Sequence, residues 1–177
     1  NVSGLRELLE TYDDVTERDI DGDGWKALHV TTFYGHFDVA KLLIQNGADV
    51  NAVDKYNDTS LQVATSNGHV DIAKLLIQNG AYVNAMDEDN ESVLYCASHY
   101  SESVPLTLEL LCLGAKIDKK ALQYDRTGLL VPIEERLIKL RNGERFITNL
   151  CSNEENKFMW NLAFCLTLKA KVPAFRV

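Results

Sequence analysis

The stretch DIDGDGWKALHV at residues 19–30 has the spacing of a calcium-binding loop. Asp19, Asp21 and Asp23 alternate as carboxylate ligands would, and Gly24 follows where such a loop bends sharply. The twelfth position should hold a glutamate that binds the ion through both of its oxygens, but Val30 stands there. We therefore expect no metal site here, and the acids and glycines need another explanation.

The other residues that could take part in catalysis or metal binding do not form any known catalytic arrangement. No cysteine or histidine pair has the spacing of a zinc site, and no nucleophile elbow, phosphate loop or dinucleotide motif occurs. We therefore expect no catalytic residues, no cofactor and no enzyme activity. The four cysteines lie among apolar residues, which predicts reduced thiols in a cytoplasmic or nuclear protein.

The distribution of charge narrows the class of partner. The formal net charge is −8, which argues against binding to nucleic acid or to an anionic membrane surface. Residues 1–115 carry 19 acidic and 6 basic side chains, whereas residues 116–177 carry 7 and 12. The first region is therefore acidic and the second is basic. The longest apolar run, residues 158–168, is too short to cross a bilayer.

The elements that position these residues repeat with a period of 33. Residues 21–53 and 54–86 match at 19 of 33 positions without a gap, and residues 87–119 continue the pattern after one inserted residue. Each unit holds two short apolar-periodic stretches, and Asn-Gly ends the second one. A helix pair of this size cannot bury its apolar face alone, so the units must stack into one continuous core.

The repeats resemble the ankyrin-repeat family over about residues 4–119. The motifs that carry the resemblance are KALH at residues 26–29, the Gly-His steps at 35–36 and 68–69, and GADVNA at 47–52 with its copy at 80–85. The resemblance implies an all-α solenoid of helix–turn–helix units with projecting β-turn loops. The second and third units lack the proline and histidine of the family's T-P-L-H turn, and we expect the first helix of each to be locally weakened.

The period divides the chain into five parts. Residues 1–20 are expected to form an N-terminal capping partial repeat, followed by repeats at 21–53, 54–86 and 87–119. Residues 120–177 are expected to hold a degenerate repeat and helices at 131–141 and 152–169. These C-terminal helices could cap the stack or form a docking segment for a second partner.

The resemblance also implies roles for particular side chains. In the family the histidines at positions 29, 36 and 69 serve the fold through hydrogen bonds. Asparagines placed like Asn51 and Asn84 are candidate substrates of an asparaginyl hydroxylase. The concave surface, made by the turn tips and the first helices, usually binds another protein.

Equivalent positions that vary between units give the candidate protein-binding residues. They form an aromatic strip flanked by acids, which would anchor and steer a basic partner. The candidates are Asp23, Trp25, Phe33, Tyr34, Tyr56, Asp58, Ser66, Asn67, Asp89, Glu91, His99 and Tyr100.

Three functions are consistent with these features. We favour a monomeric, non-catalytic module that binds another protein, with a basic segment of the partner on the acidic and aromatic concave surface. The first alternative is a two-faced adaptor or secreted effector whose C-terminal helices recruit a second complex such as a ubiquitin ligase. The second is a regulatory fragment of a larger enzyme or channel.

Overall fold

The computed structural model describes residues 19–20 and 22–141, with residues 136–141 described by backbone alone. The expected N-terminal cap up to residue 18 and the expected helix at 152–169 lie outside this range. In chain order the helices are α2 (Ala27–Phe33), α3 (Phe37–Gln45), α4 (Ser60–Ser66), α5 (Val70–Gln78), α6 (Val93–Tyr95), η1 (Cys96–Tyr100), α7 (Val104–Cys112), α8 (Lys119–Tyr124) and α9 (Leu130–Arg141).

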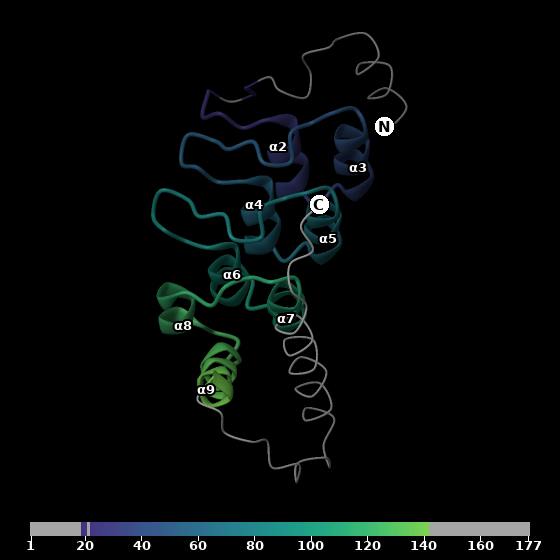
Figure 1. The fold of residues 1–177 in the computed structure, drawn as a ribbon. Coiled ribbons are helices and arrows are strands. Elements are labelled where there is room, and N and C mark those ends of the chain that lie inside the picture. The colour runs from purple at the N-terminus through teal and green to yellow at the C-terminus, as the bar shows by residue number, and fades with distance from the viewer. Residues whose placement is uncertain (1–18, 21, 142–177) are drawn as a thin grey trace, which may run out of the picture.

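The helices form two layers that run along the stack (Figure 1). Helices α2, α4 and α6 with η1 form the inner layer, and α3, α5 and α7 form the outer one. One continuous apolar core joins the layers, with residues such as Leu28, Leu61 and Leu94 at equivalent places in successive units. The expected all-α solenoid is confirmed.

The link between the two helices of a unit requires glycine. Gly35 adopts a φ of 71°, and a Cβ added there would lie 2.8 Å from Cε1 of the His69 ring. That ring belongs to the next unit, where its Nε2 lies 3.2 Å from the carbonyl oxygen of Phe33. Glycine thus serves both the left-handed conformation and the close packing of neighbouring units. The expected structural role of His69 is confirmed.

The starts of the inner helices correct one expectation. In α2, His29 Nδ1 accepts the backbone N–H of Lys26, and Nε2 lies 3.2 Å from the carbonyl of Ala52. In α4, Gln62 Oε1 accepts the N–H of Thr59, and Nε2 donates to the carbonyl of Glu91. Glutamine therefore makes the same helix-start bond as histidine, and Thr59 also caps α4 through the N–H of Gln62, so the predicted weakening of this helix start was wrong.

The inserted residue of the third unit is absorbed by a π-helical turn. The short helix α6 passes into η1, and the N–H of Ser101 donates to the carbonyl of Cys96 at 3.3 Å. Such wide turns accommodate one extra residue and often mark functional sites. Glu102 then adopts a φ of 49° at the place where the first two units have glycine. The sequence indicated the insertion but not its conformation.

A fourth, shorter helix pair follows the third unit. Asp118 caps α8 through the N–H of Ala121, and α8 packs against α6 and η1 in the inner layer. It begins one residue before the expected boundary at 119–120. Helix α9 starts at Leu130, against an expected start at 131. Within the described part of the chain, no helix has the length and apolarity needed to cross a membrane.

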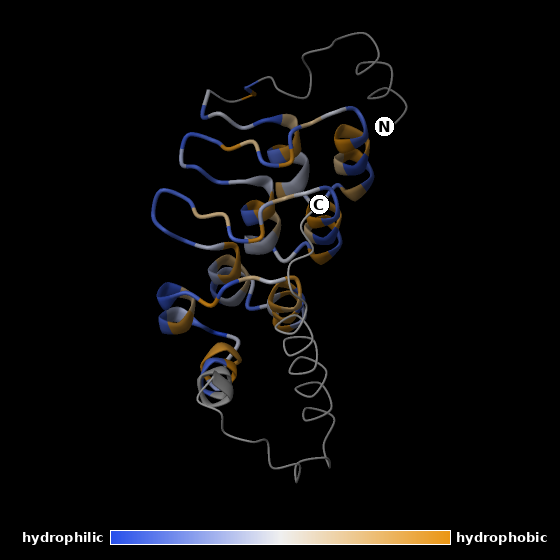
Figure 2. Ribbon diagram, viewed as in Figure 1, coloured by the Kyte–Doolittle hydropathy of each residue, from blue (hydrophilic) through white to orange (hydrophobic). Residues whose placement is uncertain are grey.

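The turns between units project from the inner-layer side and carry mostly polar residues, drawn in blue in Figure 2. Neighbouring turns are joined by backbone bonds from Lys55 N–H to the carbonyl of Asp23 and from Glu88 N–H to that of Tyr56, each 2.9 Å. The turns therefore line up beside the inner helices. Together they form the surface on which the variable residues lie.

Candidate functional site

The calcium-like stretch forms the first projecting turn. Asp19 Oδ1 accepts the backbone N–H groups of Gly22 at 2.9 Å and Gly24 at 3.2 Å. Asp23 forms an ion pair with Lys55 of the next turn, and Asp21 is not among the described residues. These acids therefore support the turns and the contact between units. Among residues 19–20 and 22–141, no group of three potential ligands could hold a metal ion.

The first aspartate of the next two units closes the following turn. Asp54 Oδ1 accepts the N–H groups of Tyr56 and Asp58, and Asp87 Oδ1 accepts those of Asp89 and Glu91, all at 2.8–2.9 Å. These two aspartates were not among the predicted binding residues. Their recurrence at one-unit spacing was the available signal.

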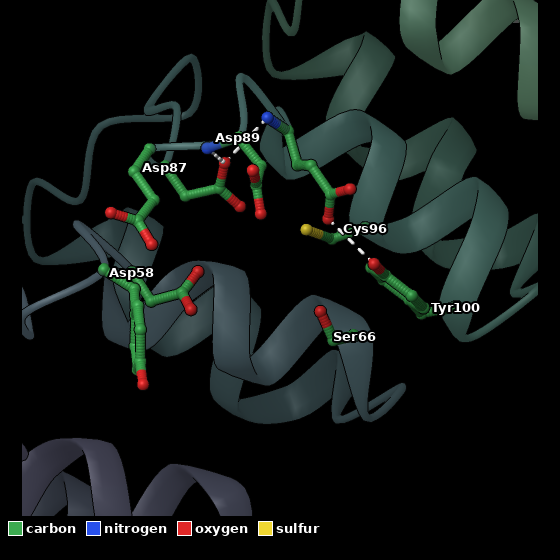
Figure 3. Close-up of a pocket in the computed structure, with 9 residues that line it drawn as sticks. Asp58, Ser66, Asp87, Asp89, Cys96 and Tyr100 are labelled. Atoms are coloured by element: carbon green, nitrogen blue, oxygen red, sulfur yellow. Dashed lines mark hydrogen bonds between the residues drawn. The ribbon is translucent and has the colours of Figure 1, made fainter.

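A hollow of about 340 Å³ lies between the second and third units, on the side of the turns and inner helices. Figure 3 shows Asp58 and Asp87 reaching it from two successive turns, and Ser66, Cys96 and Tyr100 reaching it from the inner helices. The full lining is Tyr56, Asp58, Ser66, Asp87, Glu88, Asp89, Glu91, Cys96 and Tyr100. Half of the twelve predicted residues therefore meet here: Tyr56, Asp58, Ser66, Asp89, Glu91 and Tyr100.

The carboxylates around the hollow repel one another. Burial, together with the negative charges of Asp54 and Asp87, raises the pKa of Asp58 to about 6. The pKa of Asp87 is also raised, chiefly by burial. A carboxyl whose pKa is raised in this way is costly to ionise at neutral pH and favours a nearby positive charge.

The lysines nearest to the hollow are already engaged. Lys55 pairs with Asp23, and Lys120 pairs with Glu91 at 2.8 Å. Glu91 also accepts the hydroxyl of Tyr100 at 2.9 Å. Among the ion pairs of the described residues, none includes Asp58. Glu91, which we expected to face a partner, is thus largely satisfied within the chain, whereas Asp58 is not.

The predicted aromatic strip is divided into separate groups. Trp25 contacts Phe33 with ring centroids 5.6 Å apart, and Phe33 contacts Tyr34 at 5.2 Å. Phe33 and Tyr34 are exposed, but Trp25 is half-buried and its indole N–H donates to Asp54. Tyr56 lies apart, with Lys55 over its ring.

A second aromatic group lies on α6, η1 and α8. The ring of His99 stacks on Tyr95 at 4.9 Å and meets the edges of Tyr100 and Tyr124. His99 Nδ1 also lies 3.0 Å from the carbonyl of Tyr124, so this predicted binding residue also holds the third and fourth units together. Neither Tyr95 nor Tyr124 was among the predicted residues, and Tyr124 lies in the fourth unit, which does not follow the period.

The remaining candidates lie outside the hollow. Asn67 is exposed, and its amide donates to the carbonyl of Val63 in its own helix. Asn51 bridges two units, because its amide donates to the carbonyl of Gly80 and its oxygen accepts the N–H of Tyr82. Asn84 makes the equivalent bonds one unit later. Hydroxylation of either asparagine stays a prediction.

The thiol of Cys96 is unsuited to nucleophilic chemistry. It lies at the floor of the hollow and is 2% exposed. Burial raises its pKa to about 12, so the reactive thiolate is scarcely populated at neutral pH. Cys96 is therefore a buried, protonated thiol at neutral pH.

Comparisons with known proteins agree with this architecture. A family model described as ankyrin repeats (3 copies) matches residues 1–87 and 53–121, which is more than half of the chain. The solved human ASB11 ankyrin repeat domain is 36% identical, with a TM-score of 0.50 over 52% of this chain and 41% of that one. No match was found among curated protein sequences.

The number of similar structures limits what the fold alone implies. In all, 436 chains of solved structures match, so the likeness does not identify a partner. The matched region covers less than half of the ASB11 domain, so that protein's own activity does not carry over to this chain. Ankyrin repeats generally act as protein–protein interaction modules. The chain belongs to the ankyrin-repeat family.

Proposed function

We propose that this chain is a non-catalytic interaction module that binds a basic segment of another protein on its concave surface. The concave surface is the face made by the projecting turns and the inner helices α2, α4, η1 and α8. The observation that carries the proposal is the hollow between the second and third units, whose carboxylates outnumber the cations paired with them.

The concave surface also carries exposed aromatic side chains. Tyr34, Tyr100 and Tyr124 are 65%, 52% and 45% exposed, and each belongs to a cluster of rings in contact. Exposed aromatic side chains are the usual anchors of protein interfaces, because they bury a large area at little entropic cost. Acidic groups between such anchors favour a basic partner and disfavour an acidic one.

The test is affinity capture with the full chain as bait, followed by binding measurements with each purified candidate. One variant, which we call the groove variant, carries Tyr34→Ala and Tyr56→Ala, two substitutions on the concave surface. The matched control carries Tyr82→Ala and Met86→Ala, which remove equally exposed side chains that do not line the hollow. Isothermal calorimetry on the folded variants then compares their affinities.

A true partner should bind the wild type and the control alike and lose at least about tenfold in affinity for the groove variant. Substitutions of lysine or arginine in the partner's bound segment should weaken binding further. Equal binding to all three proteins would place the interaction on another surface and contradict the proposal.

A further inference from the structure

The hollow has the dimensions of a pocket for one long side chain. At about 340 Å³, it lies at the small end of the roughly 300–1,000 Å³ typical of binding pockets. Its rim consists of Tyr56 on one turn and Tyr100 on η1, which are 45% and 52% exposed. Ser66 and Cys96 form the inner-helix side (Figure 3). A side chain entering from solvent would therefore pass between two tyrosine rings before it reached the carboxylates.

The negative charge of the lining favours a side chain that ends in a cation. The acidic groups reach the hollow from both turns, with Asp58 on one and Asp87, Glu88 and Asp89 on the other. Of these, Asp87 is committed through one oxygen to backbone N–H groups, and no ion pair of the described residues includes any of the four. A cation placed between the turns would relieve repulsion on both sides, whereas a neutral group would not.

The geometry of the acceptors favours arginine over lysine. A guanidinium presents five N–H donors in one plane, so it can bind carboxylates on two sides at once and still stack on an aromatic ring. Tyr56 already has a cation over its ring, since the ammonium of Lys55 lies 4.8 Å from the ring centre. An ammonium is a compact, strongly hydrated charge, and it gains less from a rim of this kind.

We propose that the hollow lined by Tyr56, Asp58, Asp87 and Tyr100 binds one arginine side chain of the partner's segment. Its guanidinium lies between the carboxylates of the two turns, and its aliphatic part lies against the tyrosines. The inference rests on the proposed function and narrows it to one residue type at one place. The neighbouring aromatic groups then bind apolar residues on either side of that arginine.

The experiment uses peptides selected by phage display against the full chain. Enriched sequences should share an arginine at one fixed position, with apolar residues nearby. The synthetic peptide is then compared with versions that carry citrulline or lysine at that position. Citrulline keeps the shape of arginine but removes its charge. It should weaken binding at least about tenfold, and lysine should fall between the two.

Protein variants and peptides are combined in a double-mutant cycle, in which each variant is measured with each peptide. Asp58→Asn should weaken binding of the arginine peptide and should leave the citrulline peptide unchanged, because the charge that Asp58 recognises is then absent. The control Asp38→Asn removes the same charge from an exposed site on α3 and should weaken binding of both peptides only slightly, by less than about twofold. Unfolding in urea shows whether each variant remains folded. Asp58→Asn should be at least as stable as the wild type, since the Asp58 carboxylate makes no hydrogen bond or ion pair with any other described residue.

The two proposals fail in different ways. If selected peptides bind the concave surface but contain no shared basic residue, or if citrulline costs the same in Asp58→Asn as in the wild type, the arginine pocket is wrong and the concave interface stands. If no peptide is enriched over a bait-free selection, or if the bound peptides are insensitive to Tyr34→Ala and Tyr56→Ala, both proposals are wrong.

Discussion

At the scale of single residues, Asp58 combines a cost in stability with the role in binding that we propose for it. Its raised pKa, about 6 against an ordinary 3.8, means that the folded chain holds this proton more tightly than the unfolded chain does. The direction in which stability changes with pH follows from this difference between the folded and unfolded pKa. The fold bears no penalty from Asp58 below about pH 4, loses stability as the pH rises towards 6, and bears the full cost above that.

Asp58→Asn should therefore stabilise the fold by about 1 kcal/mol at pH 7.5, a figure reduced for the partial exposure of the site. The gain should vanish by about pH 4, where the wild-type carboxyl is protonated as well. Urea unfolding curves at a series of pH values measure the difference. Asp38→Asn serves as the control and should be slightly destabilising near neutral pH, because it removes an acid from the first turn of α3. A loss of stability in Asp58→Asn would mean that the carboxylate has a structural partner.

Gln62 and His29 offer a second prediction, because they perform the same task in neighbouring units. Each accepts a backbone N–H at the start of its own helix and contacts a carbonyl farther along the chain, that of Ala52 for His29 and that of Glu91 for Gln62. Burial lowers the pKa of His29, which keeps its ring neutral and leaves one nitrogen free to accept.

Gln62→Ala should cost about 2–3 kcal/mol in the free energy of unfolding, because it leaves the buried N–H and hydroxyl of Thr59 without their acceptor and removes the bond to the carbonyl of Glu91. Gln62→His should cost less than about 1 kcal/mol, since it restores the pattern of the first unit. Chemical denaturation of both variants measures the contrast. Equal losses would show that the packing of glutamine matters more than its hydrogen bonds.

At the scale of elements, the π-helical turn η1 continues α6 in the third unit and carries Tyr100, which lines the hollow. The chain then turns through Glu102 in the left-handed region, where a side chain is strained and glycine is not. Its carboxylate forms an exposed ion pair with Arg126, which contributes little.

Glu102→Gly should therefore stabilise the protein by about 1 kcal/mol, because glycine relieves the backbone at small cost to surface contacts. Glu102→Ala is the matched control. It removes the same ion pair but keeps the strain, so it should be neutral or slightly destabilising. Thermal unfolding of the two variants separates the effects, and a lower melting temperature for Glu102→Gly would show that the ion pair dominates.

The same elements show how far the sequence could lead. The period of 33 and the Gly-His steps predicted the helix pairs and the projecting turns, because these depend on local residue types repeated in register. They did not predict η1, since an insertion can be absorbed as a loop or as a wider helical turn. They predicted that Asp58 lies on a turn and Tyr100 on an inner helix, and both line the hollow, but they could not show that Asp23 and Glu91 pair with lysines from the next turn and from α8. Those pairings depend on the spacing of stacked units, which only the folded chain defines.

At the scale of the whole molecule, the net charge of −8 should govern how fast a basic partner arrives. Salt screens such long-range attraction, with a Debye length of about 10 Å at 0.1 M ionic strength. Close contacts inside the hollow are screened less. Charges distant from the hollow should therefore change mainly the association rate. Charges within the hollow should change mainly the dissociation rate.

Stopped-flow binding of the arginine peptide should show this division. Raising the ionic strength from about 50 to 300 mM should slow association by about tenfold and change dissociation by less than about threefold. At constant salt, Asp58→Asn should act mainly on dissociation, because the carboxylate contacts the bound guanidinium directly. Asp38→Asn should slow association slightly and leave dissociation unchanged. Equal effects of the two substitutions on both rates would mean that the chain attracts its partner only as a charged surface, without a pocket for the side chain.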